Sequence, residues 1–551
     1  MRVLPARDDA LLVEVDDLDQ ALALHASLHD DPVPGVGQTV PGARTLLVPF
    51  DPWRLPAPRL TAALRERASS PAGRSWPGKR GGALQVPTVY DGEDLSDVAR
   101  LLGCSPEEVV RRHTGASWVV GFVGFAPGFA YLTGDDDRLV VPRRESPRTR
   151  VPAGSVALAG PYSGVYPRAS PGGWQLVGRT DVVTWDADRD PPTPWAPGDR
   201  VRFTAVREAV RAGRPADGGS PGSAGRSEPP TRVETTAPTA GGAGLEVVAP
   251  GLQALVQDLG RPGRAHLGVS AAGAADPRSL RAANRAVGNP VGAAAVEAAG
   301  GGLRLRARGD VVVALAGADA RAVVHRAGEL DGTDDPRRAP LARPFRLRDG
   351  DELELRAPAR GWRTYVGVRG GVDAPPVLGS RSTDTLAGLG PATPGAGALL
   401  TVDRGGTPDA VATGDVGAPD PLALPTPGEV TTLPLVLGPH DDWFAPDAVA
   451  RLHDQLWRVT DRSDRVGLRL DGAPLTRTEA ARGGELPSEG CVTGAVQVPP
   501  DGLPVLFGVD HPLTGGYPVI GAVRSSHVWL LGQLSPGSLV RFGVRTAGRA
   551  G

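Results

Sequence analysis

Two pairs of neighbouring charged residues in the last third of the chain have the types that acid–base chemistry needs. Asp510 precedes His511, and a carboxylate beside an imidazole acts as a general base when one group polarises the other. Asp464 precedes Arg465, so Arg465 would bind an anion while Asp464 accepts a substrate N–H. The alternatives are an exposed loop pair for the first and a local ion pair that caps a turn for the second.

A second concentration of reactive residue types lies in the first third of the chain. His113 ends a predicted helix, and Pro127-Gly128 between aromatic residues makes a rigid turn that can expose backbone N–H groups. Arg143 and Arg148 follow, next to glycine-rich turns, and a guanidinium matches both carboxylate and phosphate. We therefore consider an anion site here. The alternatives are ordinary surface arginines and a helix-end histidine.

Composition excludes several classes of function. The formal net charge is -2, so no basic field attracts nucleic acid or anionic lipid. The first residues have no signal-peptide pattern, and the most apolar stretch, near residues 117–132, is broken by glycine and proline. Two cysteines, Cys104 and Cys491, are too few for a zinc ribbon or an iron–sulfur cluster. We expect a cytoplasmic protein without a nucleic-acid or membrane partner and without a protein-bound metal.

The scarcity of lysine excludes further chemistry. Lys79 is the only lysine, and Arg80 follows it, so the chain has no Walker A loop. A biotin carrier domain needs a modified lysine between methionines, and Met1 is the only methionine. We therefore expect no covalently bound biotin, and no Schiff-base chemistry.

The elements that must position these residues are mainly short strands. Gly 75 and Pro 56 beside many Val and Leu residues favour strands joined by tight turns. A turn followed by an alternating strand recurs at residues 197–203, 349–355 and 536–542, which suggests three β-barrel or sandwich units. The alternative is that such hairpins occur in any β protein.

Helical patterns are few and local. Residues 18–28, 60–67, 95–102, 106–113 and 277–287 have helical periodicity or capping signals, and strand-like runs at 11–15 and 45–49 make the N-terminus a small α/β piece. The predicted organisation is an α/β domain (1–85), a barrel (86–207), a disordered linker (208–244), the two halves of a second module (245–405 and 431–546) and a flexible connection between them (406–430).

Two motifs carry a family resemblance. Residues 124–132 read Gly-Phe-x-Pro-Gly-Phe-x-Tyr-Leu and residues 170–174 read Ser-Pro-Gly-Gly-Trp. Residues 10–205 thereby resemble allophanate hydrolase subunit 1, the Kip inhibitor family, now regarded as the B subunit of bacterial 5-oxoprolinase. Residues 245–545 are similar to the partner family, allophanate hydrolase subunit 2 or the C subunit of 5-oxoprolinase, through Gly438-Pro439-His440, Ser488-Glu489-Gly490 and Thr514-Gly515-Gly516-Tyr517-Pro518. Both modules also look like the carboxyltransferase part of urea carboxylase.

The resemblance implies a fold and a reaction. The implied fold class is mainly β, with a small α/β N-terminal domain and three cyclophilin-like β-barrel domains. The implied function is the B–C component of ATP-dependent 5-oxoprolinase, which opens 5-oxoproline to glutamate with Mg-ATP and a separate A subunit of the LamB/YcsF family. The alternatives are a carboxyltransferase that uses carboxybiotin in trans and a regulatory binding protein such as a histidine-kinase inhibitor. A homo-oligomer is a further alternative for the assembly of the chain.

The same resemblance selects further binding residues. We expect the active site mainly in the second module, with His113 and the Pro127-Gly128 turn contributing across the interface. A lysine is expected after Gly-Gly-Tyr-Pro in relatives, whereas this chain has Val519. Asn289 beside Gly288 has the alternative of a helix cap, and a lone glutamate usually faces solvent. The additional candidates for substrate or nucleotide binding are Asp276, Asn284, Asn289, Glu489, Gln497, Gly515, Gly516 and Tyr517.

Overall fold

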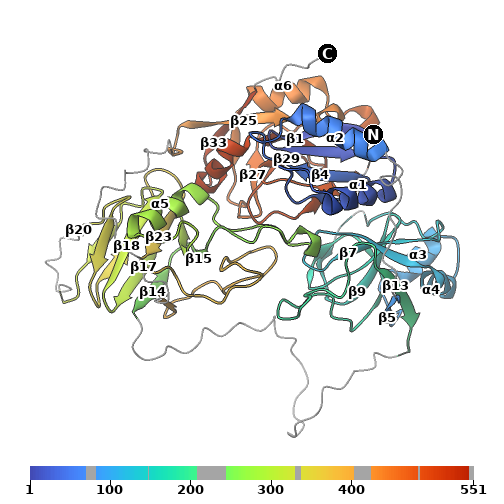
Figure 1. Cartoon of the computed structure of the whole chain (residues 1–551), viewed down its shortest axis with the longest axis horizontal. Helices are drawn as coiled ribbons and strands as arrows, with labels where there is room; N and C mark the ends of the chain where they lie inside the picture. The colour runs from blue at the N-terminus through green and yellow to red at the C-terminus, as the bar shows by residue number, and fades with distance from the viewer. Residues whose placement is uncertain are drawn as a thin grey trace, which may run out of the picture.

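Strands dominate the protein, as Figure 1 shows for the whole chain. The computed structural model describes residues 1–69, 82–144, 146, 148–207, 243–328, 337–402, 424–481, 484 and 486–544. Lys79, nearly all of the predicted linker and most of the predicted connection at 406–430 lie outside the described residues. The predicted fold class, mainly β with a small α/β N-terminal domain, is confirmed.

The N-terminal α/β unit has a four-stranded sheet in the order β1-β2-β4-β3, with both helices packed on it. The Asp17 side chain accepts the Gln20 N–H and so begins the first helix where its carboxylate also meets the positive end of the helix dipole. The apolar faces of both helices share one core with the sheet. The elements are β1 (Arg2–Arg7), β2 (Ala10–Glu14), α1 (Leu18–Asp30), β3 (Val40–Pro41), β4 (Thr45–Pro49) and α2 (Ala57–Ser69).

The first barrel is a seven-stranded sheet in the order β12-β9-β10-β7-β6-β13-β5. A bridge between Val89, just after β5, and Arg179 of β12 brings the two edge strands together, so the barrel is nearly closed. Its elements are β5 (Leu84–Thr88), α3 (Leu95–Leu101), α4 (Pro106–Gly115), β6 (Trp118–Val123), β7 (Ala130–Gly134), β8 (Arg148–Val151), β9 (Ser155–Ala159), β10 (Tyr162–Val165), β11 (Ser170–Gly172), β12 (Gln175–Arg179) and β13 (Arg200–Ala205).

The middle unit consists of a six-stranded sheet, β20-β19-β22-β17-β14-β24, and a five-stranded sheet, β15-β16-β23-β18-β21, around one apolar core. It is thus more open than the other two β units. Its elements are β14 (Gly244–Pro250), β15 (Gln253–Gln257), η2 (Ala265–Leu267), α5 (Pro277–Val287), β16 (Ala295–Ala299), β17 (Leu303–Arg308), β18 (Val311–Gly317), β19 (Val323–His325), β20 (Arg337–Arg338), β21 (Pro344–Leu347), β22 (Glu352–Glu354), β23 (Arg363–Val368) and β24 (Leu399–Thr401).

The C-terminal barrel closes completely, in the order β25-β32-β29-β30-β27-β26-β33. A small ribbon of β28 and β31 stands outside it. The elements are β25 (Val430–Leu437), η3 (Asp441–Trp443), α6 (Pro446–Asp454), β26 (Trp457–Val459), β27 (Gly467–Asp471), η4 (Glu479–Ala481), β28 (Glu489–Gly490), β29 (Ala495–Gln497), β30 (Val505–Phe507), β31 (Thr514–Gly515), β32 (Val519–Val523), η5 (Ser525–Gln533) and β33 (Leu539–Val544).

The recurring turn-and-strand pattern occupies equivalent places in the two barrels. Gly198, Gly350 and Gly537 all have positive φ and precede β13, β22 and β33. β13 runs parallel to the first strand of its barrel, β5, and antiparallel to β6, while β33 runs parallel to β25 and antiparallel to β26. In the middle unit, β22 lies between two antiparallel neighbours instead.

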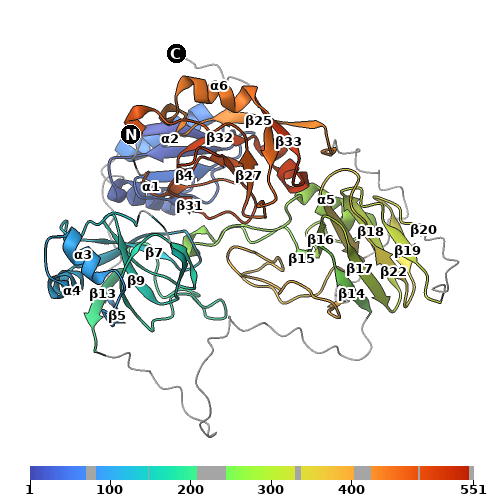
Figure 2. The same cartoon turned by 180° about the vertical axis from the view of Figure 1, so that it is seen from behind.

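The N-terminal unit packs on the C-terminal barrel, at the other end of the chain (Figure 1 and Figure 2). Leu12, Val40 and Leu47 of the N-terminal unit share an apolar cluster with Phe507 and Val519 of the barrel. The first barrel lies beside this pair, as both views show. Among the described residues, no helix is long and apolar enough to span a membrane.

Candidate functional site

The first barrel and the C-terminal barrel meet at polar residues that we call the Tyr131 cluster: Tyr131, Arg143, Ser488, Thr514, Gly515 and Gly516. Tyr131 on β7 is only 4% exposed, and its hydroxyl lies beside the side chains of Ser488 and Thr514. Thr514 Oγ1 also accepts the backbone N–H of Phe125 at 3.2 Å. A tyrosine of the first module therefore lies next to two hydroxyl groups of the second.

Burial raises the pKa of Tyr131, although its hydrogen bond to Ser488, the charge of Arg143 and its hydrogen bond to Thr514 offset part of this effect. The hydroxyl therefore stays protonated at neutral pH. It can donate a hydrogen bond to a carbonyl or phosphoryl oxygen, but it is not a base.

Glycines around Thr514 allow the two modules to approach each other closely. A methyl group on Gly124 would lie 2.4 Å from Thr514 Oγ1, so only glycine lets the β6 end come this close. A methyl group on Gly516 would lie 3.6 Å from Nη1 of Arg143, which places an exposed guanidinium beside the turn. A methyl group on Gly515 would lie 2.6 Å from Gln497 Nε2, which donates to Tyr517 O at 3.2 Å. The arrangement suits an anion or a carbonyl group.

A buried acid–histidine pair adjoins the cluster. His440 Nε2 and Glu489 Oε2 are 2.7 Å apart, and Glu489 faces Gly515 in the β28–β31 register. Burial alone would lower the pKa of His440, but the hydrogen bond and charge of Glu489 outweigh it and raise that pKa. For Glu489, burial raises the pKa, and the hydrogen bond and charge of His440 offset this rise in part. The pair can therefore share a proton between the imidazole and the carboxylate.

The N-terminal unit completes this region. Ala43 N–H donates to Ser488 O at 2.7 Å, and a methyl group on Gly42 would meet Ser488 O at 2.6 Å. His440 N–H donates to Val519 O at 3.0 Å, and the Val519 side chain is buried between the N-terminal unit and the barrel. Three units of the chain thus position Ser488 and its neighbours. In the described part of the chain, no three His, Cys, Asp or Glu side chains gather as a metal site.

A second polar group joins the middle unit to the C-terminal barrel, and we call it the Arg465 network: Arg465, Asp510, Glu297, Arg363 and Tyr365. Arg465 contacts Asp510 through Nε and Nη2 at 2.9 Å each, and Glu297 through Nη1 at 2.5 Å. Tyr365 donates to the other Glu297 oxygen at 2.7 Å, and Arg363 Nε lies 3.2 Å from Glu297. The buried charges of Arg465, Asp510 and Glu297 are therefore each paired with an opposite charge.

The pKa directions agree with this pairing. Burial raises the pKa of the Glu297 carboxyl, but the charges of Arg465 and Arg363 outweigh it, so the net pKa is lowered. Burial lowers the pKa of Arg465, and Glu297 and Asp510 more than reverse that shift. Glu297 and Arg465 therefore stay ionised.

Residues 1–195 match the family described as the carboxyltransferase domain, subdomains C and D, and residues 267–544 match subdomains A and B of the same domain. This chain belongs to the carboxyltransferase-domain family. The Tyr131 cluster lies where the two matched halves of this family meet, because Tyr131 and Arg143 come from one half and Ser488, Thr514 and the glycines from the other.

Named relatives of this carboxyltransferase-family chain are enzyme components. The B subunit of 5-oxoprolinase from Bacillus subtilis is 36% identical over 199 residues, which are 34% of this chain and 82% of that protein. The C subunit of 5-oxoprolinase from Escherichia coli K12 is 33% identical over 299 residues, which are 54% of this chain and 90% of that protein. Urea amidolyase of Lachancea kluyveri is 31% identical over 315 residues, 54% of this chain but only 17% of that protein.

The fold of the entire carboxyltransferase-family chain also has a solved relative. A crystal structure of TTHA0988 aligns with a TM-score of 0.77 at 34% identity, and the alignment covers 97% of this chain and 99% of that one. Both modules therefore occur in one chain in that protein as well.

The structure brings together six residues that the sequence proposed for binding. They lie in the Tyr131 cluster or in direct contact with it, and they are Arg143, Glu489, Gln497, Gly515, Gly516 and Tyr517. Arg465 and Asp510, which were expected to be catalytic, belong to the Arg465 network. Asp276, which was expected to bind substrate or nucleotide, lies beside it, because the Asp276 N–H donates to the Tyr365 hydroxyl at 2.8 Å. The Asp276 side chain begins α5 and accepts from Ser279 and Gln533.

His113 belongs to neither group, because it is a core residue of the first barrel. Its Nδ1 is 2.7 Å from the Tyr90 hydroxyl and its Nε2 is 2.8 Å from Ser163 Oγ. Burial lowers the pKa of His113 to about 3. With both ring nitrogens occupied and no exposed surface, it cannot reach a substrate, which argues against the expected catalytic role.

The two charged pairs of neighbours are not pairs in space. Asp464 accepts the N–H groups of Val466 and Gly467 and caps its own turn, whereas Arg465 turns inward. All three Arg465 nitrogens already contact protein groups, namely Asp510, Glu297 and Gly273 O, which argues against the expected binding of a substrate anion.

His511 likewise makes its own contacts instead of pairing with Asp510. Its Nδ1 lies 2.8 Å from Pro512 O, to which it donates, and its ring stacks on Phe507. Burial lowers the pKa of His511 to about 4. The expected acid–base pair of Asp510 and His511 is therefore replaced by two separate arrangements, one ionic and one aromatic.

The remaining expected residues hold loops together. Arg148 binds Asp94 through two nitrogens, at 2.8 Å each. Asn289 Nδ2 donates to Asn284 Oδ1 and Val368 O, so these amides fasten the end of α5, and Gly288 is the left-handed cap. The Gly128 N–H donates to Leu267 O of the middle unit at 2.9 Å. The turn after Pro127 therefore does cross the interface, but its N–H is already used.

Sequence reasoning missed several members of the two groups. Tyr131, Ser488, Thr514 and His440 all stand inside motifs that mark the family resemblance, which was the available signal. Their spacing in the sequence did not predict these contacts, because Tyr131 meets Ser488 and Thr514 across modules and His440 meets Glu489 across 49 residues.

Proposed function

We propose that this chain is the B–C component of ATP-dependent 5-oxoprolinase, which opens 5-oxoproline to glutamate together with a separate A subunit. The observation that carries the proposal is the meeting of a module similar to the B subunit with a module similar to the C subunit, within one chain, at the Tyr131 cluster. A site assembled from both modules gives a physical reason for joining them.

The proposed chemistry follows from the stability of the lactam. Amide resonance makes the ring carbonyl a poor electrophile, and phosphorylation of its oxygen creates a leaving group. In this step the lactam oxygen attacks the γ-phosphorus of ATP, the bond from that phosphorus to the ADP oxygen breaks, and the lactam N–H gives its proton to a base. The A subunit would then supply hydrolysis to glutamate and phosphate.

The residues of the Tyr131 cluster and its neighbours fit such a substrate. Arg143 beside the Gly515–Gly516 turn would hold the 5-oxoproline carboxylate or a phosphate. The protonated Tyr131 hydroxyl would donate to an oxygen that gains charge. The Glu489–His440 pair would take up the lactam proton. The nucleotide would enter as Mg-ATP, with its metal held by the phosphates.

The test is ATP turnover by the purified chain, with and without the A subunit, in the presence of 5-oxoproline, urea or neither. The expected result is ADP release that requires 5-oxoproline, with glutamate formed in step when the A subunit is present. Arg143→Gln should raise KM for 5-oxoproline, while Arg150→Gln, an exposed arginine on β8, should leave it unchanged. The absence of 5-oxoproline-dependent ADP release in every mixture would refute the proposal.

A second candidate function is carboxyl transfer from carboxybiotin supplied by another protein. The family description and the urea amidolyase similarity, over 54% of this chain, support it. It predicts consumption of carboxybiotin by the chain with urea or an amide, and no requirement for ATP. A regulatory role would instead show itself when residues 1–207, within the full chain, bind a histidine kinase without turnover.

A further inference from the structure

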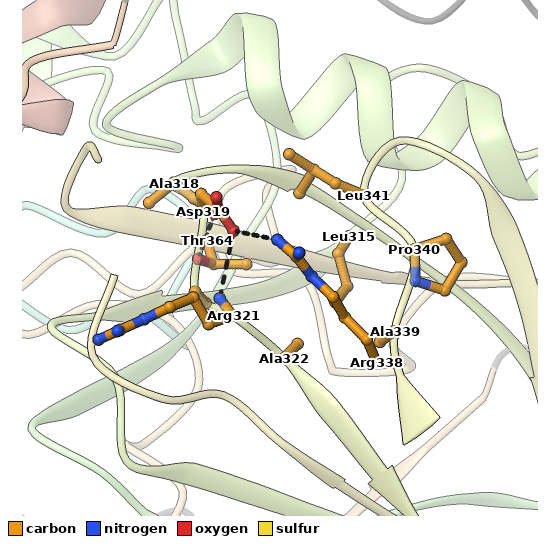
Figure 3. A pocket seen from close by; sticks show the side chains of 11 residues that line it. Leu315, Ala318, Asp319, Arg321, Ala322, Arg338, Ala339, Pro340, Leu341 and Thr364 are labelled. Carbon is orange, nitrogen blue, oxygen red and sulfur yellow. Dashed lines mark hydrogen bonds and ion pairs between the residues drawn. The ribbon is translucent and has the colours of Figure 1, made fainter. Parts of the chain in front are cut away.

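The middle unit contains a cavity of about 240 Å³ that is remote in sequence from the Tyr131 cluster. It lies where the chain leaves β18 and where the segment after β20 crosses from one sheet to the other, next to the bridge between Leu315 and Leu341. Four alanines, together with Leu315, Pro340 and Leu341, form its apolar lining. Figure 3 shows these side chains around the opening.

Two opposite charges stand at one side of this cavity. Arg338 Nη2 lies 3.8 Å from Asp319 Oδ1, and the Arg338 side chain is 75% exposed while that of Asp319 is 24% exposed. The distance is too long for a hydrogen bond, and an exposed ion pair of this kind is weak. A ligand that brings its own opposite charges can therefore separate the two residues at little cost.

The neighbouring arginine is already fixed. Arg321 Nε and Nη2 donate to Ala357 O at 3.2 and 3.0 Å, and Figure 3 shows its guanidinium directed away from Arg338. The backbone N–H of Arg321 donates to Asp319 Oδ1 at 3.3 Å, which orients the carboxylate. One guanidinium and one carboxylate thus face the opening, beside an apolar lining.

We propose that this cavity binds a free α-amino acid with an aliphatic side chain. Its carboxylate would pair with Arg338, its ammonium group with Asp319, and its side chain would lie against Leu315 and Leu341. The partial exposure of Leu341, at 45%, marks an apolar surface that such a side chain would cover. The volume is below the roughly 300–1,000 Å³ of pockets for drug-sized ligands, which fits a molecule of amino-acid size.

The cavity is a site of its own in the fold. Thr364 of β23 lines it, and its hydroxyl donates to Ala318 O at 3.0 Å. The neighbours of Thr364 on the same strand, Arg363 and Tyr365, point to the Arg465 network on the opposite face. None of the residues of the Tyr131 cluster lines the cavity, so the amino-acid site is separate from the proposed 5-oxoproline site.

The test is isothermal titration calorimetry of the full chain with L-leucine and L-valine. Isocaproate lacks the ammonium group and isoamylamine lacks the carboxylate, so each should bind about tenfold or more weakly than leucine. L-Glutamate tests whether an acidic side chain is accepted, and 5-oxoproline tests whether the heat comes from the other site.

Two variants assign the contacts. Arg338→Gln and Asp319→Asn should each weaken leucine binding about tenfold or more, and the asparagine keeps an oxygen for the Arg321 N–H. Arg337→Gln is the matched control, because Arg337 is the exposed neighbour on β20 and does not line the cavity. Thermal unfolding of each variant without ligand should match the parent. The proposal is overturned if neither leucine nor valine binds with a Kd of about 1 mM or tighter. It is also overturned if both variants bind like the parent, or if glutamate binds more tightly than leucine.

Discussion

Arg465 and Asp510 face each other through two parallel hydrogen bonds, Nε to Oδ2 and Nη2 to Oδ1, each 2.9 Å long, and both side chains are completely buried. The same guanidinium contacts Glu297 and Gly273 O in the middle unit. One side chain therefore ties the C-terminal barrel to the unit that precedes it.

Asp510→Asn should destabilise the chain by about 3–5 kcal/mol, because it leaves part of a buried guanidinium charge without its partner. Urea unfolding followed by tryptophan fluorescence measures this. Arg2→Gln is the control, since the Arg2–Asp442 pair is exposed on both sides and such pairs contribute about 0–1 kcal/mol. Equal stability of the two variants would contradict a structural role for the buried pair.

Tyr131→Phe should lower kcat of the proposed ATP-dependent reaction by about 10- to 100-fold, because it removes one preorganised donor to a charged oxygen. The folded state should lose little stability, since the ring stays packed among the aromatic residues of the first barrel. Steady-state ADP release checks the rate, and thermal unfolding checks the fold. Tyr162→Phe should keep the parental kcat, because Tyr162 is a nearby tyrosine that is not part of the Tyr131 cluster. An unchanged kcat in Tyr131→Phe would remove this hydroxyl from the mechanism.

Gly124→Ala should lower activity through Thr514, because the added methyl group would lie 2.4 Å from Thr514 Oγ1 and would push the modules apart. We expect about tenfold or more loss in kcat/KM, as misplacement of about 1 Å can cost 10²-fold. Gly115→Ala is the matched control, because a methyl group there meets nothing within 4 Å. If both variants lose the same activity, the close approach at Gly124 is not what matters.

The free energy of unfolding should decrease as pH falls below 6.5. Burial lowers the pKa of His113 to about 3 and those of His511 and His25 to about 4, from 6.5. The unfolded chain therefore binds protons that the folded chain does not, and each histidine contributes about 1.4 kcal/mol per pH unit down to its folded pKa. His440 has the opposite sign: its pKa is raised, so its contribution is present at low pH and is lost as pH rises through the folded pKa.

Denaturant unfolding at several pH values between 7.5 and 5 gives the change in the free energy of unfolding per pH unit. His25→Gln keeps a hydrogen-bonding group for Thr39, 2.6 Å from the His25 ring, and should reduce proton uptake on unfolding by about one. A stability that stays level or increases towards pH 5 would contradict the assignment of neutral buried histidines.

Local signals predicted the secondary structure well. The helix expected at 277–287 is α5, and its start is set by the Asp276 side chain and by Pro277, both of which act within one turn. The strand expected at 45–49 is β4, and Ser105 caps α4 as its sequence context indicated. Capping and alternation depend on neighbours a few residues away, so a single sequence contains them.

The candidate site was only partly predictable. The sequence pointed to Glu489, Gln497 and the Gly515–Gly516 turn through family motifs, but it also favoured His113, whose helix-end position says nothing about burial. It paired Asp464 with Arg465 because they are adjacent, whereas the structure pairs Arg465 with Asp510. Adjacent residues on a turn point in different directions, so proximity in sequence is a poor guide to ion pairing.

By itself the sequence determined the β-rich class, the helix starts, the recurring glycine turns and the absence of a Walker A lysine, because each depends on residue type and short spacing. Only the tertiary structure decided that Tyr131 meets Ser488 and Thr514, and that Phe125 binds a hydroxyl 389 residues away. Such contacts arise when separate units bury their surfaces against one another, and the free energy of that burial depends on complementary shapes that no local pattern encodes.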